Sequence, residues 1–89
     1  NVAASVGLAN QHYALGALKE AEVVLRRAAA RHPDSVAVLN NLAQTLSDLG
    51  RNDEALALIE RAVRLEETPF AAAARETHAL ILQRMGSKR

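Results

Sequence analysis

The sequence contains no cysteine and no tryptophan, and Tyr13 and Phe70 are its only tyrosine and phenylalanine. Without cysteine the chain can form no disulfide and offers no thiolate to a metal ion. A core must therefore be built from aliphatic residues, which are abundant, because hydrophobic residues make up 49% of the 89 residues. Where alanine replaces aromatic rings, helices must approach each other closely. We expect one compact domain built in this way.

The sequence also lacks an excess of one charge and a long apolar run. Eleven Lys and Arg are set against ten Asp and Glu, which gives a formal net charge of +1. This balance argues against a nucleic-acid-binding surface. The longest apolar runs, such as residues 69–74, are far shorter than the roughly 20 residues that span a bilayer. The chain begins at Asn1, and we expect a soluble fragment of a longer cytoplasmic or periplasmic protein, with no membrane insertion.

Signatures of catalysis and of cofactor binding are missing as well. The three histidines, His12, His32 and His78, lie on different segments, and no HExxH spacing occurs. No serine lies in a G-x-S-x-G turn, and the chain has no G-x-x-x-x-G-K-[ST] phosphate loop. We therefore expect no enzyme activity, no metal and no cofactor.

An internal repeat is the dominant feature that is present. Sliding the sequence against itself by 34 residues aligns identical residues, including Leu8 with Leu42, Ala9 with Ala43, Gly16 with Gly50, Ala21 with Ala55 and Ala28 with Ala62. A fixed period of this size is typical of stacked supersecondary units. The repeat predicts a single domain over residues 1–89, with a first unit at about 2–33 and a second at about 34–67.

Each unit is predicted to hold two helices. In the first unit, apolar residues recur at helical spacing in Leu8, Ala9 and Leu15, and again in Ala21, Val24, Leu25 and Ala28. Gly16 can adopt the left-handed conformation that ends a helix, and Asp34 or Ser35 can cap the next one. Pro33 to Pro69 and Gly50 to Gly86 are each 36 residues apart, so a two-residue insertion precedes a last, unpaired helix at about 69–85.

The set Leu8-Ala9, Gly16, Ala21, Ala28 and Pro33, repeated as Leu42-Ala43, Gly50, Ala55 and Ala62, resembles the signature of tetratricopeptide repeat (TPR) proteins, with a bacterial look. Ser5 and Leu39 replace aromatic residues of that signature, and Glu67 stands where the first unit has Pro33. The resemblance implies an all-α, right-handed solenoid of helical hairpins with five helices. It also implies a concave groove that binds a protein or peptide partner without catalysis.

Carrying the groove positions of the family onto this chain gives a set of candidate peptide contacts. They are Ala3, Val6, Asn10 and Tyr13 in the first unit, Ala37, Asn40, Asn41, Gln44, Ser47 and Asp48 in the second, and Ala73, Glu76, Leu80, Gln83 and Arg84 in the last helix. Their amides can pair with the donors and acceptors of an extended backbone. The same residues also fit a solvated polar helix face, and Tyr13 fits packing at the rim equally well.

The family's carboxylate clamp, which holds chaperone C-termini, is only half present. Asn10 and Asn41 match its two asparagines, whereas Val6, Ala73 and Thr77 occupy its basic positions. Without those cations a carboxylate has little to bind. We therefore expect no carboxylate-clamp binding of chaperone tails.

Two further functions remain open. The chain could self-associate into a homo-oligomer, burying Val2, Val6 and Leu8 at one end, or Ile81, Leu82 and Met85 at the other. It could also be the C-terminal appendage of a larger bacterial enzyme such as a peptidase, because residues 39–44 resemble the TPR tails of some bacterial double-glycine-type peptidases.

Overall fold

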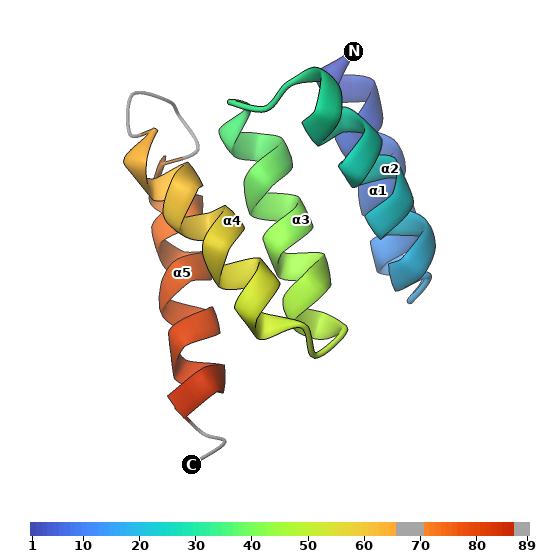
Figure 1. The fold of residues 1–89 in the computed structure, drawn as a ribbon. Coiled ribbons are helices and arrows are strands. Elements are labelled where there is room, and N and C mark those ends of the chain that lie inside the picture. Colours follow the sequence, from blue (N-terminus) through green and yellow to red (C-terminus); the bar gives the residue numbers. More distant parts are fainter. Residues whose placement is uncertain (66–70, 87–89) are drawn as a thin grey trace.

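The computed structural model describes residues 1–65 and 71–86, and in these residues it contains five α-helices and no strand (Figure 1). The helices are α1 (Val2–Ala14), α2 (Leu18–Arg31), α3 (Val36–Asp48), α4 (Asn52–Arg64) and α5 (Ala71–Gly86). The predicted fold class, an all-α solenoid of helical hairpins with an additional last helix, is confirmed. The expected start of that last helix near residue 69 lies outside the described residues.

The helix ends follow the local sequence. Ser35 is the residue that caps α3, because its Oγ accepts a hydrogen bond from the Val38 N–H at 3.4 Å. Gly16 and Gly50 follow α1 and α3 with φ angles of 76° and 84°. This left-handed conformation is costly for a residue with a Cβ, so the prediction that glycine ends each first helix is confirmed.

The helices form two layers. The domain measures 39 × 31 × 18 Å, and its smallest dimension is close to the thickness of two helices of about 10 Å each. One layer contains α1, α3 and α5, which contact one another in that order, and the other contains α2 and α4, whose Cα atoms nowhere come within 8 Å of each other. Because the first layer is packed and the second is spread, the stack curves toward α1, α3 and α5.

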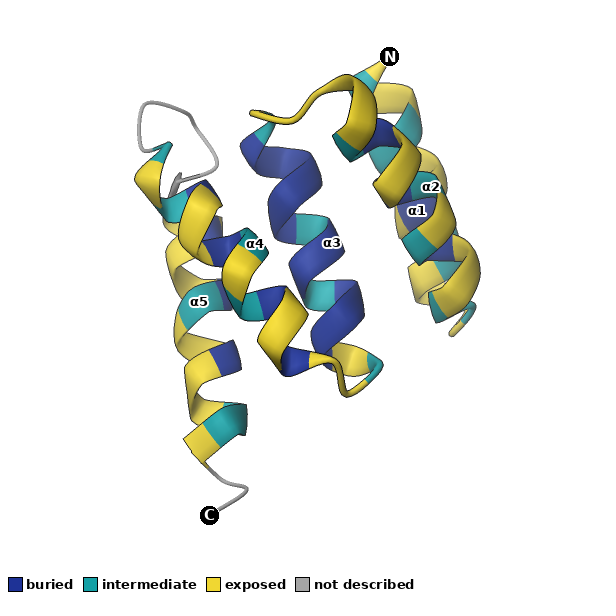
Figure 2. Cartoon of the chain, viewed as in Figure 1, coloured by how far each residue is buried: buried dark blue, intermediate teal, exposed yellow. Residues whose placement is uncertain are grey.

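Helix α3 forms the centre of the core. It packs against the four other helices, and ten of its 13 residues are buried, as the dark blue central ribbon in Figure 2 shows. Alanines occupy the close crossings: Ala21, Ala55 and Ala62 are completely buried, as the sequence predicted. Leucine and isoleucine side chains fill the spaces between these crossings.

The predicted apolar stripe of the first helix is wrong in part. Leu8 and Leu15 are 46% and 83% exposed, whereas Leu42, which corresponds to Leu8 in the second unit, is 2% exposed. Helix α2 packs against α3 on one side of the second hairpin. Among the described residues no helix packs on the corresponding side of α1, so its stripe faces outward.

Candidate functional site

The layer of α1, α3 and α5, which we call the inner layer, contains a hollow of about 790 Å³. We call this hollow the inner hollow. Helix α1 contributes Val2, Ala3, Val6, Gly7 and Asn10 to its lining. Helix α3 and its cap contribute Ser35, Ala37, Asn40 and Asn41, and α5 contributes Ala73. None of these residues carries a charge at neutral pH. The lining is therefore apolar with a few amide groups.

The three asparagines of the inner hollow differ in their surroundings. Asn10 is exposed and Asn41 is half-buried, so water can solvate their amides. Asn40 is only 7% exposed, and its Oδ1 has no hydrogen-bond partner among the described residues. A buried carbonyl oxygen without a donor lowers the stability of the fold, so this atom stands out within the hollow.

Toward the C-terminal ends of α1, α3 and α5, polar side chains join the three helices, and we call this network the polar bridge. The Tyr13 hydroxyl of α1 donates to Asp48 Oδ2 of α3. From α5, Arg84 Nη1 donates to Asp48 Oδ1 at 2.8 Å and to Ser47 Oγ at 2.7 Å. The hydrogen bond to Asp48 raises the pKa of Tyr13, burial and the Asp48 charge raise it further, and Arg84 partly opposes them. The phenol therefore stays protonated at neutral pH.

The structure sorts the candidate contacts into two groups. Asn10, Asn40 and Asn41 line the inner hollow, whereas the members of the polar bridge are paired with one another. Ser47, expected as an open groove contact, is buried, and its Oγ donates to Asn52 Oδ1 at 2.7 Å. This hydrogen bond links α3 to the first residue of α4.

The other candidates follow the same inner face. Gln44 is half-buried and donates to Thr77 Oγ1 at 3.3 Å, which links α3 to α5. Leu80 and Gln83 are exposed on α5. The sequence analysis missed Val2, Gly7 and Ser35 in the lining of the inner hollow. The helical spacing of Val2 and Val6 could have indicated that Val2 shares a face with the candidates of α1.

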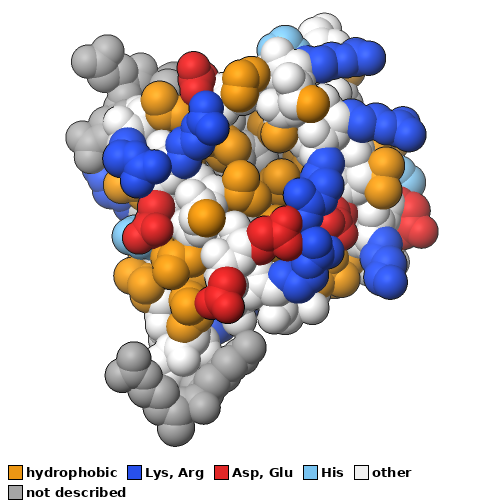
Figure 3. Space-filling model, viewed as in Figure 1, with side chains coloured by type: hydrophobic (Ala, Val, Ile, Leu, Met, Phe, Trp, Pro, Cys, Tyr) orange, Lys and Arg blue, Asp and Glu red, His pale blue; other side chains and the backbone are white. Residues whose placement is uncertain are grey.

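The layer of α2 and α4, which we call the outer layer, carries paired charges. Glu22 and Arg26 of α2 form ion pairs with Arg51 and Glu54 at the start of α4, with N–O distances of 2.5–2.9 Å. Figure 3 shows blue and red side chains side by side in this region. The hydrogen bond from Arg26 is the main cause that lowers the pKa of Glu54; burial opposes it, and a hydrogen bond from Arg51 lowers the pKa further. Burial raises the pKa of Glu22, but the two arginines outweigh it and the pKa is lowered.

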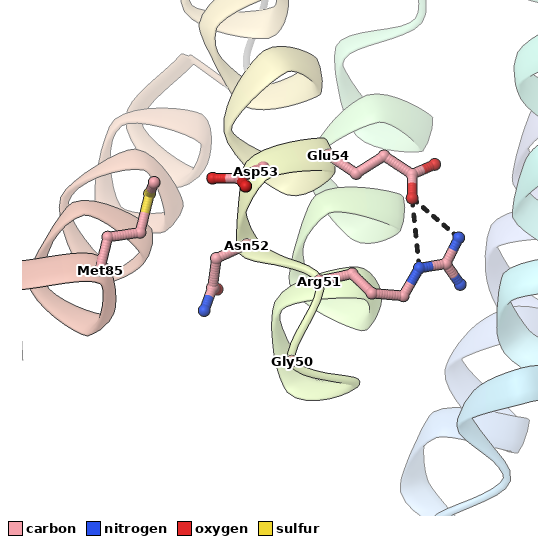
Figure 4. Close-up of a pocket in the computed structure, with 6 residues that line it drawn as sticks. All are labelled: Gly50, Arg51, Asn52, Asp53, Glu54 and Met85. Atoms are coloured by element: carbon pink, nitrogen blue, oxygen red, sulfur yellow. Dashed lines mark hydrogen bonds and ion pairs between the residues drawn. The ribbon is translucent and has the colours of Figure 1, made fainter. Parts of the chain in front are cut away.

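A second hollow, of about 420 Å³, lies between the start of α4 and Met85 of α5. Figure 4 shows the Arg51 and Glu54 side chains paired and directed away from Met85. Because its polar groups do not converge on one point, this hollow offers no arrangement for catalysis. Among residues 1–65 and 71–86, no three His, Asp or Glu side chains are grouped so that they could hold a metal ion. In the same residues, no helix is both long and apolar enough to cross a membrane.

Comparison with known proteins agrees with this architecture. A search of curated protein sequences finds no match. A family model described as tetratricopeptide repeat matches residues 12–79 of the 89. The match covers α2, α3 and α4 completely, with parts of α1 and α5. From its helical hairpins, its alanine crossings and this match, the chain belongs to the tetratricopeptide repeat family.

Proposed function

We propose that this chain is a non-catalytic module that binds an extended segment of a partner protein in the inner hollow and along the neighbouring face of α1, α3 and α5. Tetratricopeptide repeats generally mediate protein–protein interactions and are typically not catalytic. The observation that carries the proposal is an uncharged hollow of about 790 Å³ on the concave side of the stack. A volume of this size lies within the range of about 300–1,000 Å³ that is usual for ligand sites.

The lining suits a peptide backbone. An extended segment presents N–H donors and C=O acceptors along its length, and an asparagine amide can pair with both kinds of group. Asn10, Asn40 and Asn41 supply three such amides, and the valine and alanine side chains between them offer apolar surface. The hollow can therefore satisfy the backbone and cover apolar side chains of one segment.

A free C-terminal carboxylate is a poor ligand for this surface. Val6 and Ala73, at two of the clamp's basic positions, line the inner hollow, and Thr77 at the third is buried. Arg84 already pairs with Asp48. We propose that chaperone tails do not bind tightly, because no cation is found among the described residues that line the inner hollow. Calorimetric titration with an acidic C-terminal peptide tests this, and micromolar affinity that is lost on amidation of the peptide would contradict it.

The groove assignment can be tested with matched charge substitutions. A phage library of random dodecapeptides supplies ligands, and isothermal titration calorimetry measures their affinities. Ala73→Glu places a carboxylate in the inner hollow, whereas Ala30→Glu and Ala57→Glu place the same group at exposed positions of α2 and α4. Ala73→Glu should weaken binding at least tenfold, and the two control variants should bind like the parent.

Equal affinities in all three variants would show that the peptides bind elsewhere. Amide chemical shifts of the ¹⁵N-labelled chain give an independent readout. We expect the largest peptide-induced changes in α1, α3 and α5. If the largest changes lie in α2 and α4, the groove assignment is wrong.

Self-association is a second candidate function, and exposed leucines at both ends of the stack favour it. Leu8 is 46% exposed at one end and Leu82 is 47% exposed at the other, whereas the corresponding Leu42 and Leu46 are buried. One expected contact needs correction, because Ile81 is completely buried within its own chain. Light scattering over a range of concentrations tests this function, and a mass that stays monomeric throughout excludes it.

A further inference from the structure

We propose that the inner hollow selects an internal, uncharged segment with an aliphatic side chain, and that Asn40 Oδ1 accepts a backbone N–H of that segment. This inference rests on the proposed function and names the class of ligand. Three observations carry it: the uncharged lining of the inner hollow, the unpaired carbonyl oxygen of Asn40, and the engagement of Arg84 in the polar bridge.

The first step concerns charge. Among the residues that the structure describes, the lining of the inner hollow contains no Asp, Glu, Lys, Arg or His. A charged ligand side chain would lose its hydration there without meeting an opposite charge, which is strongly unfavourable. An aliphatic side chain would instead cover Val2, Val6 and Ala37, and its binding free energy grows with the apolar area that it buries. There is also room, because a Cβ added at Gly7 would meet no atom within 4 Å.

The second step concerns Asn40. Asn40 and Asn52 are each 7% exposed, but Asn52 Oδ1 accepts a hydrogen bond from Ser47 Oγ and Asn40 Oδ1 accepts none among the described residues. Asn40 lines the inner hollow, but its Oδ1 is itself buried, so a ligand in the hollow can provide the missing donor only once the carboxamide turns toward it. A carbonyl oxygen accepts only N–H or O–H groups, and an extended segment presents a backbone N–H at every residue except proline. Binding requires the carboxamide to turn toward the ligand about χ2, a torsion with a broad distribution in asparagine.

The third step concerns the ends of the ligand. Arg84 of α5 lies beside two candidate contacts of α3, because its Nη1 donates to Asp48 Oδ1 and Ser47 Oγ. A C-terminal carboxylate that approached Arg84 would share the guanidinium with Asp48 and would be repelled by the negative charge of Asp48. A segment within a longer chain brings no terminal charge and avoids this competition. The ligand is therefore an internal segment, and side chains two residues apart in it share the face that points to the apolar wall.

The composition of selected peptides tests the ligand class. Random dodecapeptides displayed with their C-termini fused to a coat protein serve as the probe. We expect the wild-type chain to enrich peptides with an aliphatic residue and no charge at the central positions, and the amidated synthetic peptides to bind as tightly as the free acids. Enrichment of acidic or basic residues at the centre, or loss of binding on amidation, would overturn the ligand class and leave the proposed groove function intact. If no selected peptide depends on the inner hollow, as judged with Ala73→Glu, the proposed function fails as well.

The hydrogen bond to Asn40 needs a separate test. The best amidated peptide is synthesised in a series with a single backbone N-methyl group at each position in turn, which removes one N–H at a time. One position should lower the affinity for the wild-type chain by about 2- to 13-fold, the range expected for a single hydrogen bond. In Asn40→Leu, methylation at that same position should change the affinity by less than twofold. Gln11→Leu, at an exposed position of α1 outside the hollow, is the matched control and should behave like the wild type.

Comparing the wild type with Asn40→Leu separates a steric effect of the methyl group from the loss of a hydrogen bond. If methylation weakens binding to Asn40→Leu as much as binding to the wild type, the methyl group clashes and no hydrogen bond to Asn40 exists. Absence of any sensitive position in the wild type would also overturn the assignment. The helix signal in circular dichroism confirms that each variant is folded before it is titrated.

Discussion

The unpaired carbonyl of Asn40 predicts that two identical substitutions will have opposite effects on stability. Asn40 and Asn52 are equally buried, at 7% exposure, and differ in that Asn52 Oδ1 accepts from Ser47 Oγ at 2.7 Å while Asn40 Oδ1 has no partner among the described residues. Leucine has the same number of side-chain heavy atoms and branches at the same carbon as asparagine. Replacing each asparagine by leucine therefore changes polarity with little change in volume.

The magnitudes follow from the cost of an unsatisfied group. Burying a donor or acceptor without a partner costs about 1–3 kcal/mol. Asn40→Leu removes such a group and should stabilise the fold by about 1 kcal/mol. Asn52→Leu creates one, because the buried Ser47 hydroxyl loses its acceptor, and it should destabilise the fold by about 1–2 kcal/mol. For a domain of this size each kcal/mol shifts the midpoint of thermal unfolding by about 4–8 °C.

Thermal unfolding followed by circular dichroism at 222 nm measures both shifts, at one protein concentration so that any association affects all samples equally. Asn40→Leu should melt above the parent and Asn52→Leu below it. If both variants shift in the same direction, the difference in hydrogen bonding does not determine their stability, and the reasoning about Asn40 is refuted. Urea unfolding at 25 °C provides a second measurement of the same difference.

Three further predictions concern packing, backbone and charge. Ala55→Trp should destabilise the fold by about 1–3 kcal/mol or more in urea unfolding, because Ala55 is completely buried at a close crossing of helices; a variant as stable as the parent would contradict the helix register. Gly50→Ala should lower the free energy of unfolding by about 1–2 kcal/mol in the same urea experiment. The cost comes from the φ of 84° alone, since an added Cβ meets no atom within 4 Å. An unchanged urea midpoint would show that the turn relaxes. Contacts with Arg26 and Arg51 lower the pKa of Glu54 in the folded state. The ionised carboxylate therefore stabilises the fold above its unfolded pKa, and this stabilisation is lost as the pH falls through its folded pKa. Glu54→Gln should therefore melt below the parent at pH 7, and the gap should narrow as the pH falls below the unfolded pKa of the carboxylate; a gap of constant size would exclude this origin.

Much of the fold could be predicted because its determinants are local and repeated. Gly16 and Gly50 mark the ends of the first helices, since few other residues accept a positive φ. Ala21, Ala55 and Ala62 mark the crossings, since only a small side chain allows helices to approach so closely. A period of 34 residues places each of these features twice, and the second occurrence corroborates the first.

The details of the site could be predicted only in part. The repeat places Asn40 and Asn41 on the first helix of a unit, and the structure brings both to the inner hollow. The repeat could not indicate that Tyr13 would pair with Asp48, 35 residues away, because that contact depends on the angle at which α1 and α3 cross. Nor could it indicate that Asn40 lacks a donor, because hydrogen-bond satisfaction is decided by atomic positions within the packed layer.

The exposure of Leu8 and Leu15 shows a different limit of the sequence. Their spacing correctly identified an apolar helix face, but spacing cannot tell whether another helix covers that face. In the second unit Leu42 is buried and Leu49 is half-buried, because α2 lies against α3. Periodicity therefore predicts which residues share a side of a helix, and only the arrangement of helices determines whether that side meets protein or solvent.

The central position of α3 determines which parts of this small domain unfold first. Every other helix touches α3, whereas α1 has a single buried residue, Ala9. Amide protons of α1 can therefore exchange with solvent through local fraying that leaves the remaining helices intact, while those of α3 can exchange only when the whole chain opens. The wall of the inner hollow formed by α1 is consequently its adjustable side, and the wall formed by α3 is a fixed reference against which an incoming segment aligns.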